Sequence, residues 1–223
     1  MAIQAIAPYP MPAEQDLPQN IAEWTIDPAR AVLLIHDMQN YFLSPFEADQ
    51  SPAQELVENV SALRSACASA GVPVAYTAQP GGMSEADRGL LKDFWGPGMS
   101  RDPAHRLILD RLAPAPGDIV LTKWRPSAFC RTDLLALMRE QGRDQLVICG
   151  VYAHVGILMT AHEGFSHDIQ TFLVGDAVAD FSLEYHRLAL DYAASRCSVT
   201  VSTRTALAAL REKAPVALRG KAS

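Results

Sequence analysis

Residues Ala31-Val32-Leu33-Leu34-Ile35-His36-Asp37-Met38-Gln39 decide the fold, because five consecutive apolar residues are followed here by a histidine and an acid. A short, continuous apolar run of this kind predicts a strand that is buried on both faces, as in parallel sheets. Ligands of open α/β sheets bind beyond the carboxyl ends of such strands. Asp37 is therefore a candidate catalytic residue, although an acid after a strand is often only a turn former or a helix cap.

The segment after this strand predicts a long helix. Ser51-Pro52-Ala53-Gln54 predicts a capping box with proline at the first helical position, and Gly71 is a typical helix stop. Between them, apolar residues recur at helical spacing: Leu56, Val60, Leu63 and Cys67. Residues 72–76 predict a second strand, and a strand-helix-strand unit with the usual right-handed crossover makes a parallel sheet.

The same alternation continues along the chain. We expect further strands at 119–122, 146–149, 171–174 and 199–201, and helices at 132–141, 156–166, 183–196 and from about 204. The predicted fold class is therefore α/β, with a three-layer, doubly wound parallel sheet of six strands.

The expected domain organisation is a single domain of residues 1–213. Five prolines in residues 1–30 exclude a continuous helix there and predict an extended arm laid over the body, which could reach a partner subunit. Residues 78–117 show no clear periodicity, and a loop of this size is usually a lid or a binding loop. Residues 214–223 are expected to fray.

Composition excludes several classes of protein. The 223 residues are 49% hydrophobic and 20% charged, and the formal net charge is −6 without a long run of like charge. Neither a nucleic-acid footprint nor a polybasic membrane patch is present. The first residues lack the features of a signal peptide, and no apolar stretch approaches the length of a membrane span. We therefore expect a cytoplasmic protein without nucleic-acid or membrane partners.

Polar groups follow each of the first four predicted strands. Asp37, Gln79 and Lys123 come after the first three, and the segment 150–154 comes after the fourth. Because the carboxyl ends of parallel strands share one edge of the sheet, these groups are expected to converge on one small ligand. No serine or cysteine stands where the loop after the fourth strand would present a nucleophile, and Gly156 is found there instead.

Other motifs for chemistry are missing from the sequence. It contains no glycine-rich dinucleotide or phosphate loop, no serine-hydrolase elbow and no zinc-protease motif. The four cysteines are expected to be mostly buried apolar thiols, and Cys149 in particular to lie on a buried strand. The six histidines are scattered, with His154 expected, after His36, to lie nearest the site. Arg88, Arg125 and Lys123 could pair with an anionic substrate, although Arg88 would be a solvated surface residue unless the 78–117 loop folds inward.

Five stretches together resemble the isochorismatase family of the cysteine-hydrolase-like fold, over about residues 5–210. They are Leu34 to Gln39, Tyr76 to Pro80, Leu91 to Gly98, Leu121 to Arg125 and Cys149 to Gly156. The resemblance implies the strand order 3-2-1-4-5-6, a homodimer, and no metal or organic cofactor. It also implies a non-proline cis peptide between Val151 and Tyr152.

The resemblance also implies roles for individual residues. Asp37 and Lys123 carry over as catalytic residues, and the substrate pocket would be lined by Phe42, Gln79, Arg88, Trp95, Tyr152 and Gly156. Polar contacts to the substrate are expected from the side chains of Gln79, Arg88 and Tyr152 and from the N–H of Gly156, whose missing side chain would leave room for a bulky ring. One departure is Pro126, where relatives usually have tyrosine.

Related amidases, such as nicotinamidases, use an Asp, Lys and Cys triad and a metal held by histidines soon after the first strand. Here Gly156 stands in the place of the cysteine, and no histidine occurs between His36 and His105. Covalent amide hydrolysis is therefore disfavoured.

Within the family, the sequence is most similar to the branch that serves phenazine biosynthesis. That resemblance implies hydrolysis of the chorismate-derived 2-amino-2-deoxyisochorismate to pyruvate and trans-2,3-dihydro-3-hydroxyanthranilate, with protonated Asp37 as general acid and no covalent intermediate. Burial would raise the pKa of Asp37 and Lys123 would lower it, and the sequence leaves that balance open.

Two alternatives stay open at this point. One is an isochorismatase that makes 2,3-dihydro-2,3-dihydroxybenzoate for a siderophore; such relatives often carry a C-terminal aryl carrier domain, which we do not expect here. The other is a non-catalytic docking subunit, against which the presence of both Asp37 and Lys123 argues.

Overall fold

The structure is a computed structural model that describes residues 3–211. Within this range six parallel strands form one sheet in the order β3-β2-β1-β4-β5-β6. Their bounds are Ile119–Thr122, Val74–Ala78, Ala31–His36, Gln145–Val151, Gln170–Ala179 and Val199–Val201 in that order. The predicted fold class and strand order are confirmed. The expected fraying of residues 214–223 lies outside the described residues.

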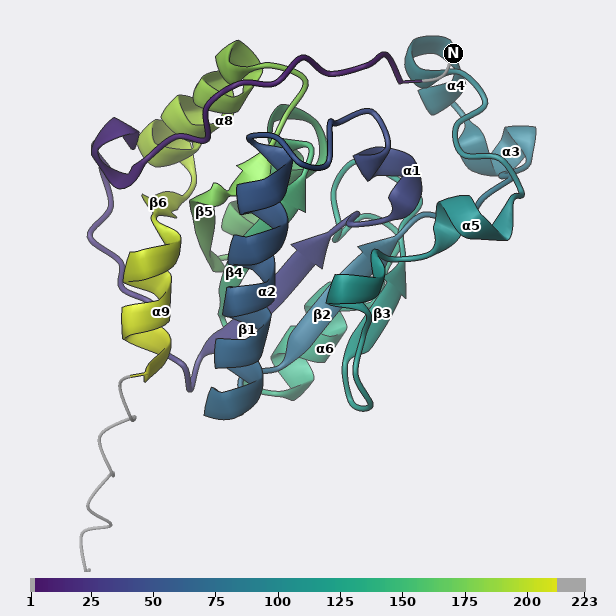
Figure 1. Ribbon diagram of the computed structural model, residues 1–223. Helices are drawn as coiled ribbons and strands as arrows, with labels where there is room; N and C mark the ends of the chain where they lie inside the picture. The colour runs from purple at the N-terminus through teal and green to yellow at the C-terminus, as the bar shows by residue number, and fades with distance from the viewer. Residues whose placement is uncertain (1–2, 212–223) are drawn as a thin grey trace, which may run out of the picture.

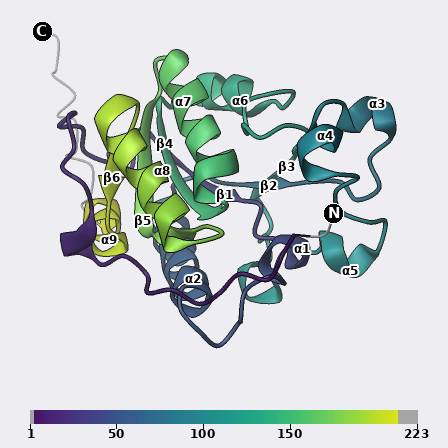
Figure 2. The same cartoon turned by 90° about the horizontal axis from the view of Figure 1, so that it is seen from above.

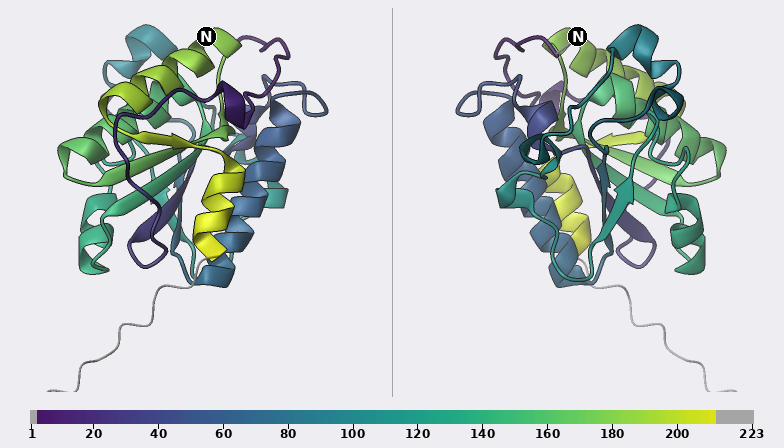
Figure 3. Two further views of the ribbon diagram at one scale, coloured as in Figure 1. Left: turned by 90° about the vertical axis from the view of Figure 1, so that its left-hand side faces the viewer. Right: turned by 90° about the vertical axis from the view of Figure 1, so that its right-hand side faces the viewer.

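Helices cover both faces of the sheet, which gives the three expected layers (Figures 1 and 2). One face carries α2 (Ala53–Ala70) and α9 (Thr203–Arg211), and the other carries α6 (Leu134–Glu140), α7 (Leu158–Ser166) and α8 (Leu183–Arg196). Figure 3 shows the sheet edge-on between these layers. No helix among residues 3–211 has the length and apolarity needed to cross a bilayer.

The central strand β1 is buried along its whole length, as its apolar run predicts. Its last residue, His36, is paired with Thr77 of β2 on one side and with Gly150 of β4 on the other. From β1 the chain moves outward through β2 and β3 and then returns to β4, so the strand order reverses beside β1. The crevice expected at such a reversal therefore opens at the carboxyl end of β1.

Two local predictions around α2 need correction. The expected capping box is wrong, because the Ser51 hydroxyl accepts a hydrogen bond from the N–H of Met11 at 2.9 Å and caps no helical N–H. The second strand begins at Val74 and not at residue 72, because Pro73 has no N–H with which to pair. The helix stop is confirmed, since Gly71 has φ +68°, a conformation that favours glycine.

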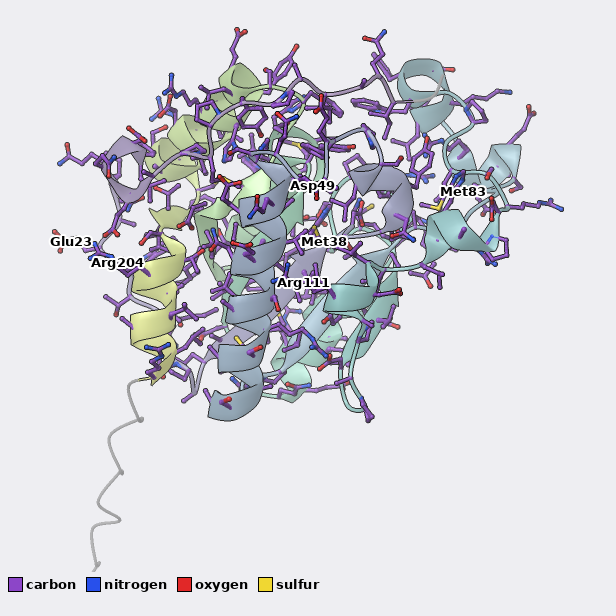
Figure 4. The ribbon with its side chains drawn as sticks, in the orientation of Figure 1. Glu23, Met38, Asp49, Met83, Arg111 and Arg204 are labelled. Carbon is purple, nitrogen blue, oxygen red and sulfur yellow. The ribbon has the colours of Figure 1, made fainter. Side chains whose placement is uncertain are left out.

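The loop predicted at residues 78–117 folds inward over the carboxyl ends of β1 and β2. It contains the short helices α3 (Glu85–Arg88), α4 (Leu91–Trp95) and α5 (Pro103–Arg106) and the 3₁₀ turn Asp110–Leu112. An isolated antiparallel bridge ties it to Gln39, close to the short helix α1 (Asn40–Leu43). Figure 4 labels Met83 in this loop and Met38, the buried residue that follows Asp37.

The N-terminal arm crosses the top of the molecule as an extended segment, interrupted by the 3₁₀ turn Glu14–Asp16 (Figure 1). Tyr9 anchors it: the Tyr9 hydroxyl accepts from the Asp180 N–H at 2.8 Å and lies 3.2 Å from Nδ1 of His186. Nε2 of His186 lies 2.9 Å from the Gly175 carbonyl, which can only accept, so Nδ1 is the acceptor for the Tyr9 hydroxyl. The arm thus packs on its own chain.

Candidate active site

A pocket opens at the carboxyl ends of β1, β2 and β4, below the 78–117 loop and the arm. It brings together all eight residues singled out in the sequence: Asp37, Phe42, Gln79, Arg88, Trp95, Lys123, Tyr152 and Gly156. The strand-end argument predicts the convergence of Asp37, Gln79, Lys123 and Tyr152, and the family resemblance implies the other four residues. Their chemical roles remain proposals, which are taken up under Proposed function.

Asp37 forms the polar floor of the pocket and is almost completely buried. Its Oδ2 accepts from Nζ of Lys123 at 2.7 Å, and its Oδ1 accepts from the Thr77 hydroxyl at 2.6 Å. The backbone of Asp37 has φ +51° and donates its N–H to Oγ1 of Thr77 at 3.0 Å. This left-handed turn is uncommon outside glycine, asparagine and aspartate, and it aims the carboxylate back over the end of β1.

The charge on Asp37 follows from opposing effects. Burial raises the pKa of the carboxyl, but the charge of Lys123 and the hydrogen bonds from Lys123 and Thr77 lower it, and the net pKa lies below its ordinary value. Without substrate, Asp37 is therefore ionised. The sequence left this balance open, and in the structure the contacts of Lys123 and Thr77 together outweigh burial.

Two glutamines hold the polar edge of the floor. Nε2 of Gln79 lies 3.3 Å from Oδ2 of Asp37. The buried Gln39 donates to the carbonyls of Gln79 and Arg106 at 3.0 and 2.9 Å, and its side-chain oxygen accepts from the Gln79 N–H at 2.7 Å. Gln39 thereby connects the end of β2 to the loop above the pocket.

Arg88 brings a buried positive charge to the pocket and is only 6% exposed. Its guanidinium donates to the carbonyls of Gly96 and Trp95 at 2.9 and 3.4 Å, and no carboxylate of residues 3–211 lies within ion-pair distance. A Cβ on Gly98 would lie 2.9 Å from Cζ of Arg88, so glycine is needed for this close packing. The surface alternative for Arg88 is wrong, because the loop folds inward.

The pocket carries an excess of positive charge. Arg125 also lines it and donates to the carbonyls of Asp87 and Trp124, both at 2.7 Å. Together with Arg88 and Lys123 this makes three cationic side chains, against Asp37 as the one acid among the described lining residues. Since uncompensated buried charge is costly, this balance favours an anionic ligand.

Aromatic rings form the opposite wall. The rings of Tyr152 and Phe181 lie 4.3 Å apart, and Trp95 and Phe42 pack at 6.1 Å from Phe181 and 6.2 Å from Tyr152, respectively. The Tyr152 hydroxyl donates to the Phe42 carbonyl at 2.6 Å. Tyr152 therefore presents its ring to the pocket, and the proton of its hydroxyl is taken by the Phe42 carbonyl.

Comparison with known proteins identifies the family. The family model described as "Isochorismatase domain" matches residues 31–205. The chain belongs to the isochorismatase family. It is 56% identical over 201 residues to the phenazine biosynthesis protein PhzD of Pseudomonas fluorescens, covering 90% of this chain and 96% of that protein. It is 58% identical over 207 residues to the isochorismatase of Bacillus subtilis, covering 93% of this chain and 66% of that protein's length.

Solved structures agree on the fold. A cysteine hydrolase from Pseudomonas syringae superimposes with a TM-score of 0.78 at 22% identity, covering 86% of this chain and 97% of that one. As a member of the isochorismatase family, the present chain is a hydrolase that acts on a small molecule.

The turn after β4 meets some expectations for this isochorismatase-family chain and departs from others. The Val151-Tyr152 peptide is cis, as the resemblance implies. The N–H of Gly156 donates to the Tyr152 carbonyl at 3.1 Å, inside a π-helical turn, Ala153–Ile157, so it is not free to bind a substrate. The position that a Cβ of residue 156 would take is filled, because it lies 2.3 Å from Cε1 of His36.

Several groups at the site escaped the sequence analysis. Thr77 holds Asp37, Phe181 completes the aromatic wall, and residues 3–6 of the arm close one side of the pocket. The sequence could have indicated Thr77, because it is a polar residue in a buried strand, two positions before Gln79. No feature of the sequence indicates the contact between the arm and the pocket, since that contact depends on how the chain returns across the sheet.

Cys149 and His154, two further residues considered in the sequence, are held within the fold. Cys149 is fully buried on β4, as expected, and burial raises the pKa of its thiol. His154 lies beside the pocket wall and pairs with Asp180 at 2.8 Å. Among residues 3–211, no three His, Cys, Asp or Glu side chains are grouped as metal ligands.

Proposed function

We propose that this chain hydrolyses the enolpyruvyl ether of 2-amino-2-deoxyisochorismate to pyruvate and trans-2,3-dihydro-3-hydroxyanthranilate. The observation that carries the proposal is the Asp37–Lys123 pair on the floor of a cationic pocket whose strand-end turn presents no nucleophile. The substrate carries two carboxylates, which suit Arg88 and the neighbouring Arg125. The relative from Pseudomonas fluorescens, named for phenazine biosynthesis, supports this choice of substrate.

The difficult step is the transfer of a proton to carbon. In the proposed reaction, the protonated carboxyl of Asp37 gives its proton to the terminal methylene of the enolpyruvyl group, and the electron pair of the C=C bond forms the new C–H bond. The product of this step is an oxocarbenium ion with a methyl group. Lys123 and Thr77 fix the direction of the Asp37 carboxyl, so the donor is held in place before the substrate binds.

Asp37 must take up a proton before that step, because Lys123 and Thr77 hold its pKa below the ordinary value. Binding of the substrate would promote this protonation. A substrate carboxylate that pairs with Lys123 weakens the interaction between Lys123 and Asp37, and it adds negative charge beside Asp37. Both effects raise the pKa of Asp37. We therefore expect the falling limb of kcat to lie at higher pH than the falling limb of kcat/KM, which reports the free enzyme.

Water completes the reaction. It adds to the oxocarbenium carbon and gives a proton back to the Asp37 carboxylate. The resulting hemiketal collapses: the bond between this carbon and the ring oxygen breaks, the ring oxygen takes up one proton, and the hemiketal hydroxyl gives up one proton as it becomes the pyruvate carbonyl. The sum is substrate plus water to pyruvate plus ring alcohol, with Asp37 regenerated and no bond to the protein at any stage.

Arg88 is expected to contribute mainly to binding. Arg88→Met keeps much of the side chain's length and removes the buried charge that has no carboxylate partner among residues 3–211. Losing one member of a buried charge pair costs about 2–5 kcal/mol, so KM should rise by roughly 30-fold or more with a smaller change in kcat. Lys92→Met, on the exposed side of α4, is the control. An unchanged KM in Arg88→Met would contradict the assignment.

The nature of the substrate is tested by measuring pyruvate release from aminodeoxyisochorismate, isochorismate and chorismate side by side. The proposal expects the highest kcat/KM with aminodeoxyisochorismate. The second candidate is isochorismate, because the relative of Bacillus subtilis is named an isochorismatase and is equally similar. A preference for isochorismate would select that candidate, and release from none of the three would overturn both.

The proposal includes a homodimer, which the family resemblance implies. Exposed apolar side chains on α7 and α8 offer a surface for it: Met159, Phe165, Tyr185, Leu188 and Tyr192. Light scattering on a sizing column should give twice the chain mass of 24.2 kDa, and Leu188→Glu should shift the species toward the monomer. A monomer for the unmodified chain would contradict this part of the proposal.

A further inference from the structure

The imidazole of His36 occupies the space beside Gly156. His36 is the last residue of β1, is completely buried and forms part of the pocket wall. A Cβ on Gly156 would lie 2.3 Å from Cε1 and 2.9 Å from Nε2 of His36, and 3.2 Å from the Pro126 carbonyl. Carbon atoms pack at about 3.5–4.0 Å, so a side chain at position 156 overlaps the ring.

Space, and not backbone conformation, is what requires glycine here. Gly156 does not have the positive φ that favours glycine, in contrast to Gly150 nearby at φ +115°. Its turn is helical, and without the ring of His36 the tightest contact left for a Cβ would be the Pro126 carbonyl at 3.2 Å. The requirement for glycine at position 156 therefore comes from His36.

The ring of His36 is held and cannot easily move aside. Its Nδ1 lies 2.8 Å from the Val151 carbonyl, which can only accept, so Nδ1 carries the hydrogen of this bond. Burial lowers the pKa of His36 to about 4, so the ring is neutral near pH 7. Nε2 is buried without a hydrogen-bond partner among residues 3–211. A side chain at position 156 would have to break the Val151 bond or displace the turn.

We propose that His36 determines the class of reaction that this pocket supports. By filling the space of residue 156, it excludes a nucleophilic side chain from the turn after β4 and leaves proton transfer from Asp37 as the route to hydrolysis. His36 is thus a positioning residue. Its effect on the type of hydrolysis rests on the proposed function. A side chain at position 156 is tolerated only when the ring of His36 is removed.

A double-mutant cycle tests this coupling through stability. Gly156→Ala alone should lower Tm by roughly 3–10 °C, because overpacking a buried site is destabilising. In the His36→Ala background, which removes the ring, the same Gly156→Ala change should lower Tm by no more than about 1 °C. An equal loss of Tm in both backgrounds would overturn the proposal. Gly164→Ala in both backgrounds is a control, because its Cβ would meet Thr171 and Phe129 and not His36.

A second readout measures whether removing the His36 ring makes a thiol at position 156 accessible to a reagent. With Cys130→Ser to remove the one half-buried thiol, alkylation by iodoacetamide is followed by peptide mapping. The thiol introduced by Gly156→Cys should react at least about tenfold faster with His36→Ala than without it, as expected for a thiol that gains access to the pocket. Equal rates in the two variants would contradict the proposal.

Rescue of turnover links the coupling to the reaction. Gly156→Ala should reduce the rate of pyruvate release, and adding His36→Ala should recover part of it; a further loss in the double variant would contradict the role of His36. The Tm and alkylation readouts do not depend on turnover. Their failure overturns the assignment of His36 alone, whereas normal coupling in a chain that releases no pyruvate overturns the proposed function alone.

Discussion

Asp37→Asn should lower kcat for pyruvate release by on the order of 10²–10⁴-fold, the usual contribution of a positioned general acid. Asparagine keeps the size of the side chain and tolerates the left-handed backbone at φ +51°, so the fold of the turn is expected to survive. It cannot donate a proton from a carboxyl group. Substrate binding should be retained, because the cations Arg88, Arg125 and Lys123 all remain.

The measurement is steady-state pyruvate release together with a titration of the variant with substrate. Asp118→Asn is the matched control. Asp118 lies at the amino end of β3, whereas the pocket lies at the carboxyl ends of the strands, and Asp118 pairs with Arg64. Activity of Asp37→Asn within about tenfold of the parent, a loss of only ~1.4 kcal/mol in the barrier, would rule out Asp37 as the donor.

Lys123→Met should reduce kcat/KM by roughly 30-fold or more, because it leaves Asp37 buried without its cation and removes a partner for the substrate carboxylate. The pH dependence of kcat/KM in this variant is more informative than the size of the loss. In the parent chain Lys123 helps to hold the pKa of Asp37 below its ordinary value. Removing this cation raises that pKa, so the acid form persists to higher pH.

The sign of the shift follows from the role of Asp37. A general acid is active when protonated, so kcat/KM falls as the pH rises through its pKa in the free enzyme. The falling limb should therefore move to higher pH in Lys123→Met, and Lys92→Met should leave it in place. A limb that stays or moves to lower pH in Lys123→Met would contradict Asp37 as the acid and favour its action as a base.

Much of the fold could be predicted because it depends on local patterns. The apolar run of β1, the helical repeat ending at Gly71 and the alternation of strands and helices each have a local cause. The prediction failed where a distant segment intervenes. The Ser51 hydroxyl accepts a hydrogen bond from Met11 of the arm, and β5 continues past Gly175 because Val178 and Ala179 pair with Gly150 and Val151 of β4.

The candidate site could be predicted in part for the same reason. Asp37, Gln79 and Lys123 follow strands, and topology alone brings strand ends together. The contact between His36 and Gly156 could not be predicted, because it depends on the ring orientation between two strands that are more than a hundred residues apart in the chain. The same holds for the pKa of Asp37, whose direction depends on the contacts that Lys123 and Thr77 make with one buried carboxylate.

The central claim is that the ether is cleaved on its enolpyruvyl side, after a proton from Asp37 reaches the methylene carbon. Hydrolysis in H₂¹⁸O, with mass spectrometry of the ring product, tests it most directly, because a ring alcohol does not exchange its oxygen with water whereas the pyruvate carbonyl does. The account predicts a ring product without ¹⁸O. One ¹⁸O atom in the ring product would show that water attacks the ring carbon, and would contradict it.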